Sequence, residues 1–227
     1  MPEASTTAFF AALRDGNELA VDTALGTDTA VLRARDVDGS SPVAAAMRAG
    51  RRKIAERFAD GLATTPDGLD IFDAACVGNV ATIRTLLHSD RADVDLRGMD
   101  GYAPLHLAAE FGQVEVVRLL SGRGADPNAV SLNEERATPL HRAISGGHRD
   151  TASLLLALGA SPNAIERGGL TALHLAASHG DEAIVDMLLL RGADATRRAD
   201  DGKTPVDVAC DHGHAALARL LETASKR

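Results

Sequence analysis

Aromatic residues and cysteines are scarce in this chain of 227 residues. It contains no Trp, one Tyr and five Phe, so aromatic residues make up 3% of a sequence that is 45% hydrophobic. Alanine and leucine carry much of the apolar content, which suits thin layers of closely packed helices and argues against an enzyme with an aromatic-lined pocket. The only two cysteines, Cys76 and Cys210, stand far apart in the sequence, and we therefore expect no disulfide framework.

Long apolar runs and an excess of positive charge are also missing. No stretch approaches the ~20 apolar residues that cross a bilayer, and residues 1–7 lack the basic start and the apolar core of a signal peptide. We therefore expect a cytoplasmic protein that does not insert into a membrane. The formal net charge of −8 argues against a general nucleic-acid binder, which is normally basic.

Repetition is what the chain has in abundance. A phrase close to Thr-Pro-Leu-His, followed by small and apolar residues, recurs four times at spacings of 35, 33 and 33 residues. In the first copy, Pro104 fits the first turn of a helix, apolar residues recur at helical spacing, and Gly112 ends the helix after about two turns. A second apolar helix and an outward turn over 124–129 follow. The four copies are Ala103–Ala109, Thr138–Ile144, Thr171–Ala177 and Thr204–Ala209.

The two-helix unit, its period and its opening phrase resemble the ankyrin-repeat family, and the resemblance extends over nearly the whole chain. It implies an all-α fold: an α-solenoid of about seven stacked repeats, in which each helix-turn-helix is followed by an outward β-turn or hairpin. We expect one ankyrin domain over 1–227, whose first unit has lost the phrase as terminal repeats commonly do. Aligned on the glycine that closes each first helix, the expected units are 5–35, 36–64, 65–97, 98–131, 132–165, 166–198 and 199–227.

Two outward turns depart from the period. Only 28 residues separate Gly50 from Gly78, so the turn between the second and third units, around 60–70, must be shortened. Either the stack continues through this shortened turn, or two blocks of repeats meet there at a hinge. The turn over 129–137 is instead two residues longer than its neighbours, which reflects either sequence drift or a specific contact.

The recurring histidines invite a catalytic interpretation, but their pattern favours a structural one. His106, His141 and His174 occupy the same place in successive units, whereas a catalytic site needs different groups that converge. The ankyrin resemblance implies that these imidazoles satisfy backbone groups at the starts of the helices. The sequence also lacks a phosphate-binding glycine loop, a His-Glu-x-x-His motif and a nucleophile elbow. We therefore predict that the protein is not an enzyme and uses no cofactor.

A second candidate for chemistry is the segment 210–214, which reads Cys-Asp-His-Gly-His. Cysteine and histidine side chains are ligands of zinc and other transition metals. The alternative function is therefore a metal- or small-ligand-binding regulatory protein that uses Cys210, His212 and His214. The same segment also fits the ordinary junction between the two helices of a repeat, in which case it holds no metal.

Binding of another protein is the leading functional prediction. The family resemblance implies a non-catalytic adaptor or regulatory scaffold, monomeric when alone, that binds its partner on the concave face of the stack. The only Tyr, Tyr102, falls in one unit with Met99 and Phe111, where these residues are either exposed anchors for a partner or, for Phe111, packed against the next unit. The predicted partner contacts are Met99, Asp100, Tyr102, Glu110, Phe111, Glu134, Glu135, Arg136, Ser145, Arg167, Leu170, Ser178, His179, Asp200, Lys203, Asp211 and His212.

A basic run is the strongest local positive feature of the chain. Arg48 is followed by Arg51, Arg52, Lys53 and Arg57. We interpret the run as the solvated face of a helix in an edge unit, or as a contact for an acidic partner.

Overall fold

The computed structural model describes residues 3–27, 29–65, 68–88 and 93–226. These residues form fourteen α-helices in seven consecutive pairs, together with two short 3₁₀ helices, and they contain no strand. The predicted all-α repeat solenoid is thus confirmed. The helices are α1 (Glu3–Asp15), α2 (Glu18–Thr27), α3 (Pro42–Arg48), α4 (Arg52–Ala63), α5 (Ile71–Val77), α6 (Val80–Leu86), α7 (Pro104–Glu110), α8 (Val114–Ser121), α9 (Pro139–Ser145), α10 (Arg149–Ala157), α11 (Ala172–His179), α12 (Glu182–Leu190), α13 (Pro205–Asp211) and α14 (Ala215–Ala224), with η1 at Thr29–Arg33 and η2 at Arg167–Gly169.

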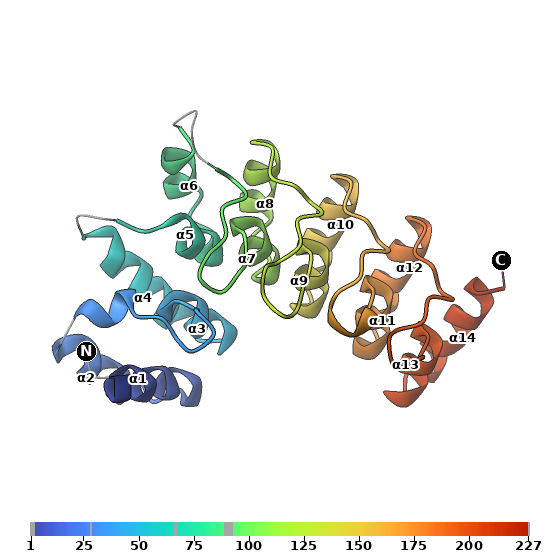
Figure 1. The fold of residues 1–227 in the computed structure, drawn as a ribbon, viewed down its shortest axis with the longest axis horizontal. Helices are drawn as coiled ribbons and strands as arrows, with labels where there is room; N and C mark the ends of the chain where they lie inside the picture. Colours follow the sequence, from blue (N-terminus) through green and yellow to red (C-terminus); the bar gives the residue numbers. More distant parts are fainter. Residues whose placement is uncertain (1–2, 28, 66–67, 89–92, 227) are drawn as a thin grey trace.

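The helix pairs follow one another along an arch (Figure 1). The first helices α5, α7, α9, α11 and α13 each contact the next and lie on the inner side of the arch, whereas α6, α8, α10 and α12 form an outer row. A single apolar core runs through the stack, and small residues such as Ala108 and Ala109 are fully buried where neighbouring helices approach. The inner helices and the outward turns between the units therefore form one continuous inner face. We call the outward turns that precede α3, α7, α9, α11 and α13 fingers.

The histidine of the repeated phrase caps the starts of α7, α9 and α11. In α9, the backbone N–H of Thr138 and its hydroxyl donate to Nδ1 of His141 across 3.2 and 2.8 Å, and α11 repeats this arrangement with His174. Burial lowers the pKa of His106 and His141 to about 4, so both imidazoles are neutral at pH 7. The predicted structural role of these histidines is confirmed.

The same histidines also link neighbouring units. Nε2 of His106 lies 3.1 Å from the carbonyl oxygen of Ala137, and Nε2 of His174 lies 3.2 Å from that of Lys203. Two asparagines add a second link. Nδ2 of Asn128 donates to the carbonyl of the next unit at Gly159, and Asn163 repeats the bond one unit later.

The shortened turn changes how the fingers neighbour one another. α4 continues to Ala63, and α5 contacts α3 and α4 on one side and α7 on the other. The finger before α3 meets the finger before α7 directly. Their backbones are so close that a methyl group added at Gly39 would lie 2.5 Å from the backbone of Met99. Residues 66 and 67, inside the segment for which a hinge was the alternative, lie outside the described residues.

The lengthened finger before α9 is bound to its neighbour by specific contacts. Leu132 N–H donates to the carbonyl oxygen of Gly101, and Nδ2 of Asn133 donates to that of Asp100, both across 2.9 Å. In the finger before α7, Gly101 has a left-handed backbone conformation. Arg136 takes the equivalent position in this finger with φ of 51°, a conformation that residues other than glycine seldom adopt. Fingers of ordinary length are linked in a similar way, by Arg167 N–H to the carbonyl of Glu135 and by Asp200 N–H to that of Gly168, so what the lengthened finger adds is the side-chain bond of Asn133.

Candidate functional site: a charged hollow on the inner face

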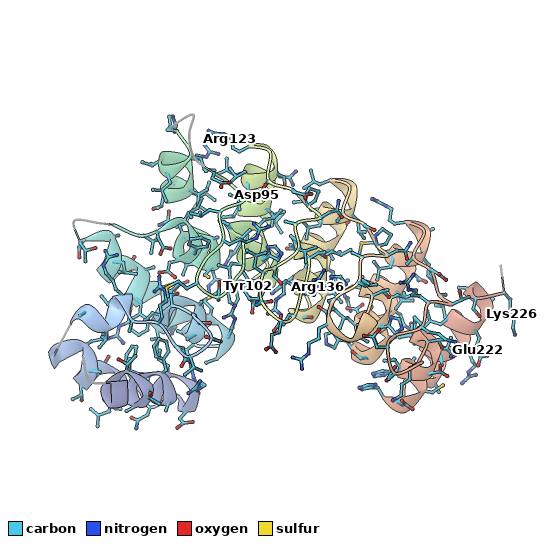
Figure 2. All side chains as sticks on the ribbon, viewed as in Figure 1. Asp95, Tyr102, Arg123, Arg136, Glu222 and Lys226 are labelled. Carbon is cyan, nitrogen blue, oxygen red and sulfur yellow. The ribbon has the colours of Figure 1, made fainter. Side chains whose placement is uncertain are left out.

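A hollow of about 530 Å³ opens where four fingers meet on the inner face. Figure 2 places Tyr102 and Arg136 on this inner side, whereas Arg123 lies at the outer edge of the arch. The wall combines carboxylates, guanidinium groups and one aromatic ring. Its residues are Asp38, Arg48, Asp100, Tyr102, Asn133, Glu134, Glu135, Arg142 and Arg167.

Beside this wall, one carboxylate is held between two guanidinium groups. Glu110 ends α7 and is 8% exposed. Arg48 from α3 donates through Nε to Oε1 at 2.8 Å and through Nη2 to Oε2 at 3.0 Å, and Arg142 from α9 donates through Nη2 to Oε1 at 2.6 Å. Burial alone would raise the pKa of Glu110, but the hydrogen bonds from Arg48 and the two positive charges outweigh it and lower the pKa. The three groups therefore stay ionised and fix one another in place.

Arg48 reaches Glu110 across an intervening unit. Arg48, Cys76 and Glu110 each stand two residues before the glycine that closes a first helix, so they share one register on α3, α5 and α7. Cys76 is buried and short, which leaves room for the long Arg48 side chain to pass over α5. Opposite charges in one register, two units apart, are the sequence signal that could have revealed this pair.

Tyr102 lies between the two arginines. The Cζ atoms of Arg48 and Arg142 are 5.6 and 5.2 Å from the centre of its ring, within the range of cation–π attraction. Its hydroxyl donates to Oε2 of Glu135, which also accepts a hydrogen bond of 2.8 Å from Arg142. Burial raises the pKa of Tyr102, and the nearby charge of Glu135 raises it further.

The expectation that Tyr102 is an exposed anchor is wrong. The ring is 4% exposed because the guanidinium groups cover it, and Phe111 is half-buried against the core, as the packing interpretation stated. Glu110 is likewise buried rather than free to meet a partner. Met99, by contrast, is 78% exposed.

The remaining predicted contacts fall into two groups. Asp100, Glu134, Glu135 and Arg167 line the hollow, together with Tyr102. The others lie outside its lining. They are Arg136, Ser145, His179, Asp200, Lys203, Asp211 and His212, which are exposed, and Leu170 and Ser178, which are half-buried.

Four lining residues were not predicted: Asp38, Arg48, Asn133 and Arg142. The basic run was interpreted as one solvated face, and its later members on α4 are indeed exposed. For Arg48 that interpretation is wrong, because its side chain is only 25% exposed and pairs with Glu110. It belongs to α3, and its direction toward α7 depends on the stacking of the units.

The alternative metal site is not formed. Within the described ranges, no group of three or more His, Cys, Asp and Glu side chains is arranged to hold a metal ion. Nδ1 of His212 lies 2.9 Å from the carbonyl oxygen of Val208, and Nε2 of His214 lies 3.1 Å from that of Ser178 in the preceding unit. Because these bonds hold the imidazoles against the backbone, Cys210, His212 and His214 do not converge, and we correct that prediction.

Comparisons with known proteins agree with the repeat architecture. A model of ankyrin repeats in three copies matches residues 71–166, and a model of ankyrin repeats in many copies matches residues 155–209. Together they cover more than half of the chain. None of the helices in the described residues is long and apolar enough to cross a membrane.

Three curated relatives illustrate the extent of the similarity. Ankyrin repeat and SAM domain-containing protein 6 of Danio rerio is 33% identical over 98 residues, 40% of this chain and 13% of that protein. Human ankyrin repeat and SOCS box protein 3 is 32% identical over 104 residues, 43% of this chain and 20% of its own length. Human ankyrin repeat domain-containing protein 29 is 44% identical over 64 residues, 28% of this chain and 21% of its own length. The matches thus span a small part of each relative.

Proposed function

Because this chain belongs to the ankyrin-repeat family, we propose that it is a non-catalytic adaptor or regulatory scaffold that binds a segment of another protein on its inner face. The observation that carries the proposal is the hollow bounded by Tyr102 and Glu135. Its walls come from four fingers and two helices, and ion pairs and hydrogen bonds already hold them. A surface that is rigid before binding loses little conformational entropy when a partner docks.

The chemistry of the hollow also supports binding rather than catalysis. Beside the hollow, the carboxylate of Glu110 is already ion-paired with Arg48 and Arg142, so these charged groups are not free to act on a substrate. Among the described residues, no serine, cysteine or histidine lines the hollow, so a Ser–His or Cys–His type of nucleophile and base is not assembled there. Recognition would then depend on shape and on charge complementarity.

We further propose that the contact surface continues along the inner face toward the C-terminus. Such an extension would let a partner segment longer than the hollow bind. We also propose that the protein works in a reducing cytoplasm, because both cysteines are free thiols. The residues proposed for this extension are Ser145, Leu170, Ser178, His179, Asp200, Lys203, Asp211 and His212.

Site-specific photocrosslinking tests the proposal. A photoreactive amino acid replaces Glu134 at the rim of the hollow or, as a control, Leu190 on the outer helix α12; both side chains are strongly exposed. In extracts of the source organism, we expect Glu134→photoprobe to capture a discrete protein that Leu190→photoprobe does not capture. Equal capture from both positions, or capture from neither, would contradict binding on the inner face.

A further inference from the structure

Exposed apolar side chains gather beside the hollow. The described residues include five large apolar side chains that are more than three-quarters exposed, and three of them stand on the fingers before α3, α7 and α9. These are Val37 (94%), Met99 (78%) and Leu132 (76%). The other two, Leu19 and Leu190, lie on α2 and α12. The concentration on adjacent fingers marks a contact surface rather than scattered surface residues.

These three side chains form a row because of the shortened turn. The third unit contributes no full finger, so the finger that carries Val37 abuts the backbone of Met99 through Gly39. Leu132 is joined to the finger before α7 by the hydrogen bond from its N–H to the carbonyl of Gly101. We call Val37, Met99 and Leu132 the apolar row.

The apolar row borders the hollow residue by residue. Val37 directly precedes Asp38, Met99 precedes Asp100, and Leu132 precedes Asn133, and each of these polar residues lines the hollow. The row and the lining share the backbone of three fingers, so an extended partner segment can contact both.

The hollow has an unbalanced negative charge. Four carboxylates line it against three guanidinium groups. Arg142 engages Glu135, Glu134 lies 3.6 Å from Arg167, and Arg48 is held by Glu110 beside the wall. Asp38 and Asp100 remain, with Arg48 at 3.7 Å from Asp100.

The electrostatics of Asp100 point the same way. Burial raises the pKa of Asp100, and the negative charges of Glu110 and Asp38 also act to raise it, against the opposing effect of Arg48. An additional cation at this place would relieve that repulsion.

We propose that this surface binds an extended segment of a partner protein in which an arginine or lysine is flanked by aliphatic residues. The cation enters the hollow toward Asp38 and Asp100, and the aliphatic side chains cover the apolar row. The inference rests on the proposed function and adds the chemistry of the partner. Charge complementarity selects a basic segment, and apolar contact next to it contributes affinity.

The test begins with a library of short random peptides displayed on phage and selected on the full chain. We expect the enriched peptides to carry Arg or Lys next to aliphatic residues. Binding of an enriched peptide, measured by fluorescence anisotropy, should weaken about ten-fold in the double variant Asp38→Asn/Asp100→Asn and by a similar factor in Met99→Ser/Leu132→Ser. Raised ionic strength should weaken binding to the unmodified chain more than binding to the Asp38→Asn/Asp100→Asn variant.

The variants are chosen to leave the fold intact. Asparagine keeps the side-chain oxygen that accepts from Ser40 N–H at Asp38 and from Tyr102 N–H at Asp100. Met99 and Leu132 are mostly exposed, so serine there removes little buried surface. Asp186→Asn/Leu190→Ser on α12 is the matched control, which should bind as the unmodified chain does.

Each other outcome overturns the inference. Enrichment of acidic or uncharged peptides would contradict the predicted positive charge of the partner. Basic peptides that bind both inner-face variants as tightly as the unmodified chain would contradict the predicted binding site. Failure of the library to yield a binder, or binding of a labelled RNA oligonucleotide that these variants abolish, would also reject a basic peptide as the occupant. Crosslinking at Glu134 decides the proposed function separately, because it does not depend on the chemistry of the partner.

Discussion

The half of the stack from α9 to α14 and the half from α3 to α9 are built in different ways. In the C-terminal half, equivalent residues repeat equivalent bonds: His141 and His174 close their helices alike, and Asn163 repeats the link that Asn128 makes just before α9. In the N-terminal half, the central contact joins Arg48 to Glu110, which are 62 residues apart and belong to units that are not neighbours. Regular repeats thus hold the stack together, and departures from the repeat create a distinctive surface.

The difference arises from single positions in a shared register. Asp73 and Arg142 stand five residues before the closing glycine, where the other first helices have Ala11, Ala45, Leu107, Leu175 and Val208. A charge placed at a normally apolar position must find a partner. Asp73 accepts a hydrogen bond from the Ser41 hydroxyl, and Arg142 pairs with Glu110 and Glu135. The stack therefore keeps its scaffold while its inner face acquires charge.

The largest expected effect comes from breaking the network at its centre. Glu110→Gln removes the charge that two guanidinium groups share, and we expect a loss of about 3 kcal/mol in the free energy of unfolding because both cations lose their main partner. Urea denaturation measures this. The control is Asp211→Asn, at the same register in α13, whose loss of an exposed pair with Lys203 should cost far less. Equal losses of unfolding free energy in the two variants would contradict the difference between the two halves.

A smaller, pH-dependent effect is expected at Asp73. This residue of α5 is 3% exposed, and its burial, with the charge of Asp70 nearby, raises its pKa to about 7. The unfolded chain releases the proton near pH 4, so the fold loses stability as the pH rises from about 4 to about 7 and the loss is constant above that.

The variant Asp73→Asn isolates this contribution, because asparagine stays neutral throughout. From about pH 4 to pH 7, the unmodified chain should progressively lose stability relative to Asp73→Asn, as measured by urea denaturation at each pH. A difference that is flat with pH, or that favours the unmodified chain as the pH rises, would show that Asp73 is already ionised in the fold.

The smallest effect belongs to the regular half. Asn163→Ala removes the hydrogen bond of 2.8 Å to the carbonyl of Gly192 and the one of 2.8 Å from Asp194 N–H. Because both are exposed, we expect a loss of about 1 kcal/mol, and Asn128→Ala should lose the same within about 0.5 kcal/mol. Thermal or urea unfolding of the two variants checks this. Clearly unequal losses would mean that the repeats are less equivalent than their bonds indicate.

Much of the fold could be predicted from local pattern, and less of the site. The seven helix pairs and the role of His174 follow from residues that recur at a fixed period, because each repeat uses the same short-range bonds. Tyr102 was placed on the inner face by its register, but its burial was missed. Whether a ring at that place is covered depends on Arg48 and Arg142, which come from other units and approach only when the units stack.

The periodic order of apolar residues, glycines and Thr-Pro-Leu-His phrases is thus sufficient to specify an ankyrin stack, because every unit buries its apolar side against a copy of itself. The tertiary structure decided which side chains meet across units that are not equivalent. Omission of one finger lets Gly39 approach Met99, and the short Cys76 lets Arg48 reach Glu110. These contacts depend on distances between units, and a one-dimensional pattern does not contain such distances.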